Sequence, residues 1–305
     1  MTLDNLIFKY LQYCKNIKQL DDLTIKAYMT DLKQFCDHFN DTEINDISAQ
    51  DIEGYISILH SNFKPKTVKR KVASIKAFYH YLEYKDFLYY NPFSKICIKF
   101  REPLILPKII PLSSIEAILH AAYEERINGT TPRRRENSLR DVAMLELLFA
   151  TGMRISELCS LTPYSVDLLN HVVLIHGKGS KERMIQVENP MTLSALNNYY
   201  DRFYEAIKKC DSFFANKNGT PLSDQSARRI IRRYTELASI NQHITPHMFR
   251  HTFASSLLDA GVDIRYIQEL LGHSSISVTQ IYTHVSLSKQ KEILATKHPR
   301  NQFKI

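Results

Sequence analysis

Apolar residues recur at spacings of three and four along residues 1–90, the pattern of amphipathic helices. One stripe follows Asp21-Asp22 and another begins near Lys66. The two inward-facing sets are Ile25, Tyr28, Leu32 and Phe35, and Val68, Val72, Ile75, Tyr79 and Leu82. The pattern predicts a helical first domain over residues 1–90.

The opposite side of the second helix is basic, with no acidic residue between Lys64 and Lys76. Such a face suits the phosphate backbone of a duplex, and it is equally well explained as a solvated helix surface. Phosphate contacts of this kind position a protein on DNA but read no sequence. The candidate DNA-binding residues on this face are Lys64, Lys66, Lys69, Arg70, Lys71 and Lys76.

The helical pattern is interrupted after residue 90 by Pro92, Pro103, Pro107 and Pro111. Residues that precede proline favour extended backbone, so residues 91–111 are predicted to form a linker. Residues 112–305 then form a second domain, mostly helical, in which residues 168–187 predict two strands joined by a Gly-rich turn. Residues 124–139, with arginine at 133, 134 and 135, predict a polar loop. The expected fold class is mainly α with a small β-sheet.

Composition adds little to this picture. Lysine and arginine outnumber aspartate and glutamate by 40 to 32, which gives a net charge of +8 and favours a polyanionic partner such as nucleic acid. A mildly basic protein from an AT-rich genome has the same balance. The five cysteines are scattered and form no C-x-x-C pair, which argues against a disulfide framework or a thiolate zinc site. No apolar run is long enough for a signal peptide or a membrane span, so a cytoplasmic location is expected.

Arg154 lies between two predicted helices. Ser138 and Asp141 resemble a capping box at the start of the first helix, and Gly152 suits a left-handed residue at its end. Arg154 then begins the next helix, where free backbone N–H groups favour an anion. The alternative is a local structural pair with Glu157.

The turn of the predicted hairpin carries a lysine. Lys178 lies between Gly177 and Gly179, where its ammonium group is able to reach into a groove and to protonate a leaving oxygen. Lys181 is a competitor for this role. A lysine in a turn is usually only a solubilising charge, so this assignment depends on the neighbouring motifs.

The run TPHMFRHTFASSLLDAG begins a helix that carries a histidine and an arginine. Thr245 suits the N-cap and Pro246 the first helical position, so His247 and Arg250 share a face. His247 and His251 are four apart, a spacing that suits zinc, but methionine stands where metalloprotease chemistry needs glutamate. No acidic cluster offers a magnesium site, and no metal is expected.

A second histidine and a tyrosine follow the helix that stops at Gly272. His273 comes directly after the stop, where histidine often interacts with a helix dipole. Tyr282 follows, and a half-buried tyrosine is common in any protein. Joint occurrence argues against these ordinary explanations. Two arginines, two histidines, a lysine and a tyrosine are together able to grip a phosphate, move protons and attack phosphorus.

Several blocks of the sequence resemble those of the tyrosine recombinases, the phage integrase family, most of all the Xer type. They are TIKAYMTDLKQF, KTVKRKVASIKAFYHYL, ATGMRISEL, HGKGSKER, TPHMFRHTFA, LLGHSSISVTQIYTHV and KHPR. The resemblance implies a helical core-binding domain followed by a catalytic domain of mixed α/β, mostly α, structure. It implies as catalytic residues Arg154, Lys178, His247, Arg250, His273 and the nucleophile Tyr282.

By this resemblance the chain is expected to be a site-specific DNA recombinase that needs no metal, cofactor or ATP. It would cut and rejoin double-stranded DNA through a 3′-phosphotyrosyl intermediate and a Holliday junction. The implied assembly is a homotetramer on two sites, or a heterotetramer with a related recombinase, and Ile293 and Leu294 would dock the tail on a neighbour. Integration or excision of a mobile element and resolution of chromosome dimers both fit. A type IB topoisomerase-like enzyme and a non-catalytic DNA-binding protein remain as alternatives.

Overall fold

The computed structural model describes residues 2–40, 42–98, 100, 107–177 and 182–272. The predicted residues outside these ranges are Lys178, Lys181, His273, Tyr282, Ile293 and Leu294. The chain divides into two compact units, residues 1–104 and residues 105–305. Among the described residues, no helix combines the length and the apolar character that crossing a membrane requires.

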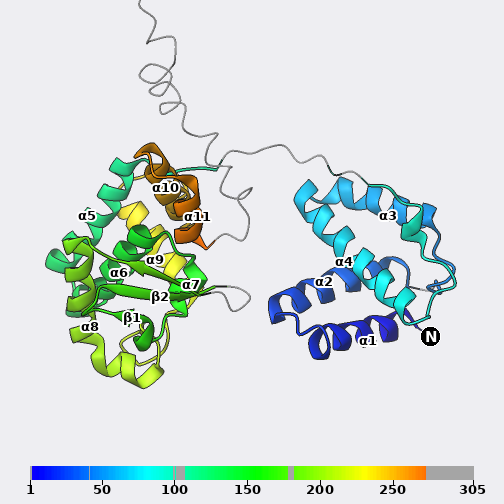
Figure 1. Cartoon of the computed structure of the whole chain (residues 1–305), viewed down its shortest axis with the longest axis horizontal. Helices are drawn as coiled ribbons and strands as arrows, with labels where there is room; N and C mark the ends of the chain where they lie inside the picture. Colours follow the sequence, from blue (N-terminus) through cyan, green and yellow to red (C-terminus); the bar gives the residue numbers. More distant parts are fainter. Residues whose placement is uncertain (1, 41, 99, 101–106, 178–181, 273–305) are drawn as a thin grey trace, which may run out of the picture. The chain divides into compact units, whose positions relative to one another are not determined.

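The first unit is built from α1 (Leu3–Asn16), α2 (Asp22–His38), α3 (Ala49–Asn62), α4 (Pro65–Tyr84) and the short 3-10 helix η1 (Pro92–Ser94). Helices α1, α2 and α4 pack on one another and α3 packs on α4 (Figure 1). Asp21 caps α2 by accepting from the Thr24 N–H at 2.8 Å. Phe35 and Tyr79 are fully buried and meet edge to face in the core. Apart from Ile25, the residues of the two predicted apolar stripes therefore belong to one core or pack against it.

A buried carboxylate on α2 alters the predicted basic face of α4. Asp31 is enclosed, and it accepts hydrogen bonds from Lys71 Nζ at 3.1 Å and from Ser74 Oγ at 2.9 Å. Arg70 pairs with the same carboxylate from its exposed side. Lys71 is only 3% exposed, so its prediction as a surface DNA contact is wrong: a buried charge needs a buried partner. The exposed lysines of the predicted face are Lys64, Lys66, Lys69 and Lys76.

The second unit is mostly helical with a small sheet, as expected. Its helices are α5 (Leu112–Asn128), α6 (Pro132–Thr151), α7 (Ile155–Cys159), η2 (Pro163–Ser165), α8 (Pro190–Cys210), α9 (Asp224–Leu237), α10 (Pro246–Asp259) and α11 (Ile264–Leu271). Its strands are β1 (Val166–Asp167), β2 (Val172–His176) and β3 (Glu182–Gln186). Every residue of α6 from 141 to 148 is buried, which makes α6 the central helix.

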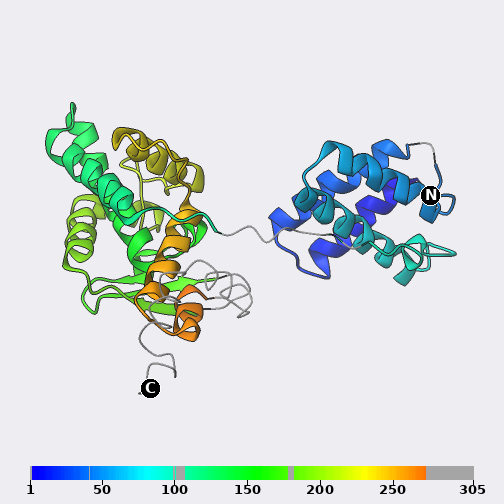
Figure 2. The same cartoon turned by 90° about the horizontal axis from the view of Figure 1, so that it is seen from above.

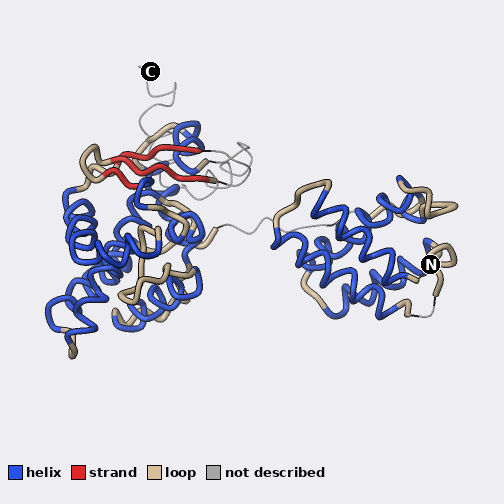
Figure 3. The backbone as a smooth tube through the Cα atoms, turned by 90° about the horizontal axis from the view of Figure 1, so that it is seen from below, coloured by secondary structure: helices blue, strands red, loops and turns tan. Residues whose placement is uncertain are grey.

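The three strands form an antiparallel sheet in the order β1-β2-β3. Figure 3 shows the strands along one side of the helical unit. The predicted hairpin is confirmed, with Val173 opposite Ile185 and Ile175 opposite Arg183. Ile175 and Ile185 point into the core, and α11 packs beside β3 (Figure 2).

The predicted loop at residues 124–139 is mostly helical. Helix α5 continues to Asn128 and α6 begins at Pro132, so only residues 129–131 connect them. Thr131 caps α6 by accepting from the Arg134 N–H at 3.2 Å, and proline occupies the first turn. Ser138 is not a cap, because it lies inside α6 and its Oγ donates to the Arg135 carbonyl at 2.6 Å.

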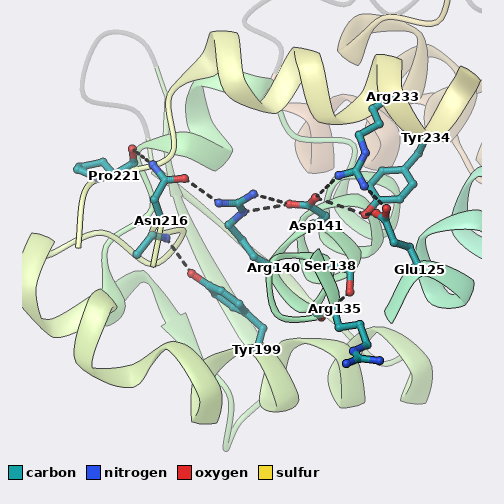
Figure 4. Close-up of polar contacts among 11 residues, drawn as sticks. Glu125, Arg135, Ser138, Arg140, Asp141, Tyr199, Asn216, Pro221, Arg233 and Tyr234 are labelled. Carbon is teal, nitrogen blue, oxygen red and sulfur yellow. Dashed lines mark hydrogen bonds and ion pairs between the residues drawn. The ribbon is translucent and has the colours of Figure 1, made fainter. Parts of the chain in front are cut away.

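A buried polar network joins α9 to α5 and α6 (Figure 4). Asp141 on α6 accepts from Arg140 Nε at 3.0 Å and Nη2 at 2.7 Å. On α9, Tyr234 Oη donates to Glu125 of α5 at 2.7 Å and Arg233 pairs with the same carboxylate. Burial raises the pKa of Asp141, while the charge of Arg140 opposes this. Asp141 Oδ2 also accepts from Tyr234 Oη at 3.4 Å and lies 3.9 Å from Arg233 Nη1, so Asp141 joins α6 to α9 and does not cap a helix.

The end of the predicted linker is bonded to α10. The buried Ile110 donates its N–H to Thr252 Oγ1 at 2.8 Å, and Gln242 Nε2 donates to the Ile109 carbonyl at 3.3 Å. Thr252 lies on the helix that carries His247 and Arg250. The chain that enters the second unit is thus attached to this helix.

Candidate active site

The turn between α6 and α7 presents Arg154. Gly152 ends α6 in the left-handed region, at a φ of 59°. A Cβ at this position would lie 2.5 Å from Cδ1 of Phe253 on α10, so no larger residue fits. Arg154 follows as the N-cap residue of α7. Both sequence expectations for this turn are confirmed.

Glu157 holds Arg154 in place. The Arg154 N–H donates to Glu157 Oε2 at 2.9 Å, and its Nη1 donates to Oε1 at 2.7 Å. The structural pair considered from sequence is therefore present. It leaves other guanidinium donors of Arg154 available, because an arginine carries five N–H groups. The side chain is 37% exposed, so a phosphate is able to approach it.

Helix α10 begins at Thr245 and Pro246, as predicted, although Thr245 makes no side-chain capping bond. Arg250 is only 4% exposed and spans two segments. Its Nη1 donates to the Gly152 carbonyl at 3.0 Å, and its Nη2 donates to the Leu271 carbonyl at 2.6 Å. Arg250 thereby ties the turn before Arg154 to the end of α11.

His247 has an exposed side chain in a positively charged environment. Its pKa is lowered by burial first, and then by the charges of Arg228, Arg250 and Arg154. The imidazole is therefore neutral at neutral pH and able to accept a proton. His247 also lines a cavity of about 360 Å³. The other lining residues are Lys108, Gln242, His243, Thr245, Met248 and His251.

Arg228 lies near His247 and is not among the residues predicted from the sequence. It lies in the first half of α9 and is exposed, close enough to lower the pKa of His247. The signal was present in the run SARRIIRRYTEL, where arginines repeat on one side of a helix whose other side is apolar. Arg233 of the same run is committed to the network with Glu125.

The structure brings together Arg154, His247 and Arg250. Four predicted residues lie outside the described part of the chain: Lys178, Lys181, His273 and Tyr282. Two described residues close to them in the sequence, Arg183 and Leu271, contact residues of this site. Arg183 on β3, the strand after Lys178, pairs with Glu157. The carbonyl of Leu271, close before His273, accepts from Arg250.

Comparison with known proteins places the chain in a family. The pattern described as "Phage integrase family" matches residues 113–289, and that of "Phage integrase, N-terminal SAM-like domain" matches residues 7–85. A tyrosine recombinase of Agathobacter rectalis is 56% identical over 300 residues, which cover 97% of this chain and 97% of the relative. Tyrosine recombinase XerC of Bacillus subtilis is 35% identical over 304 residues, which cover 97% of this chain and 95% of the relative.

A solved structure shares the fold. The site-specific recombinase XerH, solved with its palindromic difH substrate after cleavage, matches with a TM-score of 0.74 at 20% identity, over 95% of this chain and 83% of that chain. A helical domain followed by a mostly helical domain with a small sheet is the architecture of the tyrosine recombinases. This chain belongs to the phage integrase family and is a tyrosine-type site-specific recombinase, most similar to the Xer type. The resemblance drawn from the motif blocks is confirmed.

Proposed function

We propose that the enzyme cuts and rejoins double-stranded DNA through a covalent bond to Tyr282. The phenolic oxygen attacks the scissile phosphorus, so a Tyr–O–P bond forms and the bond to the 5′ oxygen breaks. His247 takes the phenolic proton, and Lys178 gives a proton to the leaving 5′ oxygen. Rejoining reverses these steps with a 5′-hydroxyl as the nucleophile. The phosphodiester bond energy is conserved in the 3′-phosphotyrosyl link, so no ATP is needed.

Two guanidinium groups stabilise the charge that develops on the non-bridging oxygens. Arg154 and Arg250 supply planar donors that match a phosphate, and His273 adds a hydrogen bond. The observation that carries this proposal is the bond from Arg250 Nη1 to the Gly152 carbonyl, 3.0 Å long, in the turn that presents Arg154. It holds the two arginines in one site before substrate arrives, which is the condition for electrostatic catalysis. The proposal needs no metal ion, because arginine supplies the positive charge.

DNA contacts outside this site fall on two separate surfaces. In the first unit, the proposed core-binding domain, the exposed lysines of α4 would contact backbone phosphates. In the second unit, the exposed Arg228 and the hairpin lysine Lys181 would lie close to the cleaved strand. Arg70 is committed in part to Asp31 and contributes less to binding.

Recombination needs two sites, and we infer that four protomers act on them through a Holliday junction. The partners are identical copies, or a related recombinase supplies half of them. The tail with Ile293 and Leu294 would join neighbours. The reaction serves chromosome dimer resolution or the integration and excision of a mobile element, and sequencing the DNA held in the covalent adduct separates these roles.

The direct test is adduct formation on nicked DNA that carries the target site. The wild-type protein is expected to form an adduct that resists SDS, and Tyr282→Phe is expected to form none. The matched control is Tyr164→Phe, because Tyr164 is 88% exposed and is not one of the proposed catalytic residues. An adduct in Tyr282→Phe would overturn the assignment of the nucleophile.

Two further assays separate the alternatives. A type IB topoisomerase would relax supercoiled DNA that lacks the target site, whereas a recombinase exchanges strands between paired sites. A DNA-binding protein without catalysis would bind site DNA and form no adduct at any protein concentration.

A further inference from the structure

Arg183 on β3 is nearly buried and contacts the site, yet none of the proposed chemical steps uses it. Its side chain is 10% exposed. Nη2 donates to Glu157 Oε2 at 2.7 Å and Nη1 donates to Oε1 at 3.3 Å. Nε donates to the carbonyl of Leu270 at 2.9 Å. One guanidinium group therefore joins β3, α7 and α11.

The partner of Arg183 is the carboxylate that holds Arg154. Burial alone would raise the pKa of Glu157, but hydrogen bonds from Arg183 and from the Arg154 backbone N–H outweigh it and lower the pKa. Glu157 is therefore ionised at neutral pH, and it lies between two cations. Without Arg183, Glu157 would keep the bonds from the Arg154 N–H to Oε2 and from Arg154 Nη1 to Oε1, but both come from the residue that it has to hold. Arg183 supplies the charged donor from a second element, β3.

The end of α11 holds Arg183 still. Gly272 has a φ of 64°, and a Cβ on it would lie 3.0 Å from Nη1 and 3.2 Å from Cδ of Arg183. The guanidinium group thus packs against the glycine that ends α11 while it bonds the Leu270 carbonyl. The next carbonyl, that of Leu271, accepts from Arg250. Two arginines from different elements hold consecutive carbonyls at the same helix end.

We propose that Arg183 is a positioning residue for the strand-transfer reaction. The end of α11 fixes Arg183, Arg183 fixes Glu157, and Glu157 fixes the guanidinium group of Arg154 that meets the scissile phosphate. Arginine suits this position because its rigid fork serves a carboxylate and a carbonyl at once, whereas a lysine ammonium is a single point charge. The proposal rests on the proposed function, in which Arg154 stabilises the charge of the phosphate.

The test compares adduct formation by wild type and Arg183→Gln on two nicked substrates. One carries an ordinary scissile phosphate, and the other carries a methylphosphonate, which lacks the negative charge that Arg154 stabilises. On the phosphate, Arg183→Gln is expected to lose about 10²-fold in rate, the typical loss when a reacting group is slightly displaced. On the methylphosphonate the same variant is expected to lose much less. Arg183→Lys keeps the charge without the fork. On the phosphate its rate is expected to lie between those of wild type and Arg183→Gln.

The comparison separates positioning from folding. A variant that simply folds poorly loses active molecules and is slowed equally on both substrates, so an equal loss would overturn the proposal, as would no loss at all. If Arg183→Gln is insoluble, the two substrates are compared with Arg183→Lys, which is expected to show a smaller difference between them in the same direction. The matched control is Arg202→Gln, which removes the exposed ion pair of Arg202 with Glu136 and is expected to leave both rates unchanged. Failure of the wild type to form any adduct would instead refute the proposed function.

Discussion

Arg250 donates from Nη1 to the main-chain carbonyl of Gly152 at 3.0 Å, so the helix that supplies one arginine is bonded to the turn that supplies the other. A backbone carbonyl cannot be altered by substitution, so this connection depends on Arg250 alone. Gly152 also packs against Phe253, which lies on α10 together with Arg250. The spacing between the two arginines is therefore determined by contacts made before any DNA binds.

Replacement of Arg250 by lysine should abolish most of the activity. A lysine cannot bond the Gly152 and Leu271 carbonyls together and still present a planar donor to a phosphate. The rate of adduct formation should fall by about 10²–10³-fold, as when one preorganised donor is lost. Arg265→Lys, an exposed change on α11, serves as the control and should be near wild type. A normal rate in Arg250→Lys would mean that the reaction needs neither the two carbonyl bonds nor the planar donor of Arg250.

Gly152→Ala should destabilise the second unit. The alanine Cβ would overlap Phe253, and its backbone would be held in a left-handed conformation. Each effect costs on the order of 1–3 kcal/mol, so thermal unfolding should occur at a clearly lower temperature. Gly54→Ala is the matched control, because Gly54 lies in α3 with nothing within 4 Å of the new Cβ. That change should raise stability by about 0.5–1 kcal/mol, the usual gain on replacing a helical glycine.

The rate of adduct formation should tolerate acid to an unusual degree. His247 accepts a proton only when neutral, and its pKa is lowered by burial and by Arg228, Arg250 and Arg154. The rate should therefore stay constant through about pH 6.5, where an ordinary histidine titrates, and fall only at lower pH. Removing a neighbouring positive charge raises the pKa, so Arg228→Gln should move this fall to higher pH.

Arg229→Gln provides the control for the pH experiment, since it removes a neighbouring exposed charge that does not shift the pKa of His247. Rates measured from pH 5 to pH 8 on one nicked substrate are sufficient to locate the fall. If the rate fell at the same pH in wild type and Arg228→Gln, His247 would not be the group that titrates.

Replacing Lys71 should lower the stability of the first unit, whereas replacing Lys66 should weaken DNA binding. Lys71→Met leaves the enclosed Asp31 with one charged partner fewer and should cost about 3 kcal/mol of unfolding free energy. Lys66 is exposed, so Lys66→Gln should leave stability unchanged. It should instead weaken binding of all duplexes alike and reduce the salt dependence of binding by about one counterion. Urea unfolding measures the stability, and DNA titrations at several salt concentrations measure the binding. A Lys71→Met variant as stable as wild type would contradict the conclusion that Asp31 needs Lys71 as a charged partner.

Local signals in the sequence are sufficient to predict where the helices that position the site begin and end. Gly152 and Gly272 were predicted to end helices, and both adopt the left-handed conformation. Thr245 and Pro246 were predicted to begin α10, and they do. The same threonine–proline pair at Thr131 and Pro132 was overlooked, because the arginines that follow it made the segment look like a polar loop. Cap chemistry was the more reliable signal there.

Partners far apart in the sequence explain the remaining differences. Nothing near Lys71 in the sequence shows that Asp31, on another helix, will bury it. Likewise, the pairing of Arg183 with Glu157 appears only when β3 is packed beside α7 and α11. Periodicity identifies which face of a helix is apolar, but it cannot identify the single polar residue that a neighbouring helix will bury.

The hydrogen bond from the Ile110 N–H to Thr252 Oγ1 makes the segment before α5 part of the support of α10. Thr252 stands on the same helix as His247 and Arg250. Loss of the Thr252 hydroxyl would therefore leave the buried Ile110 N–H without this acceptor, beside the helix that bears both side chains.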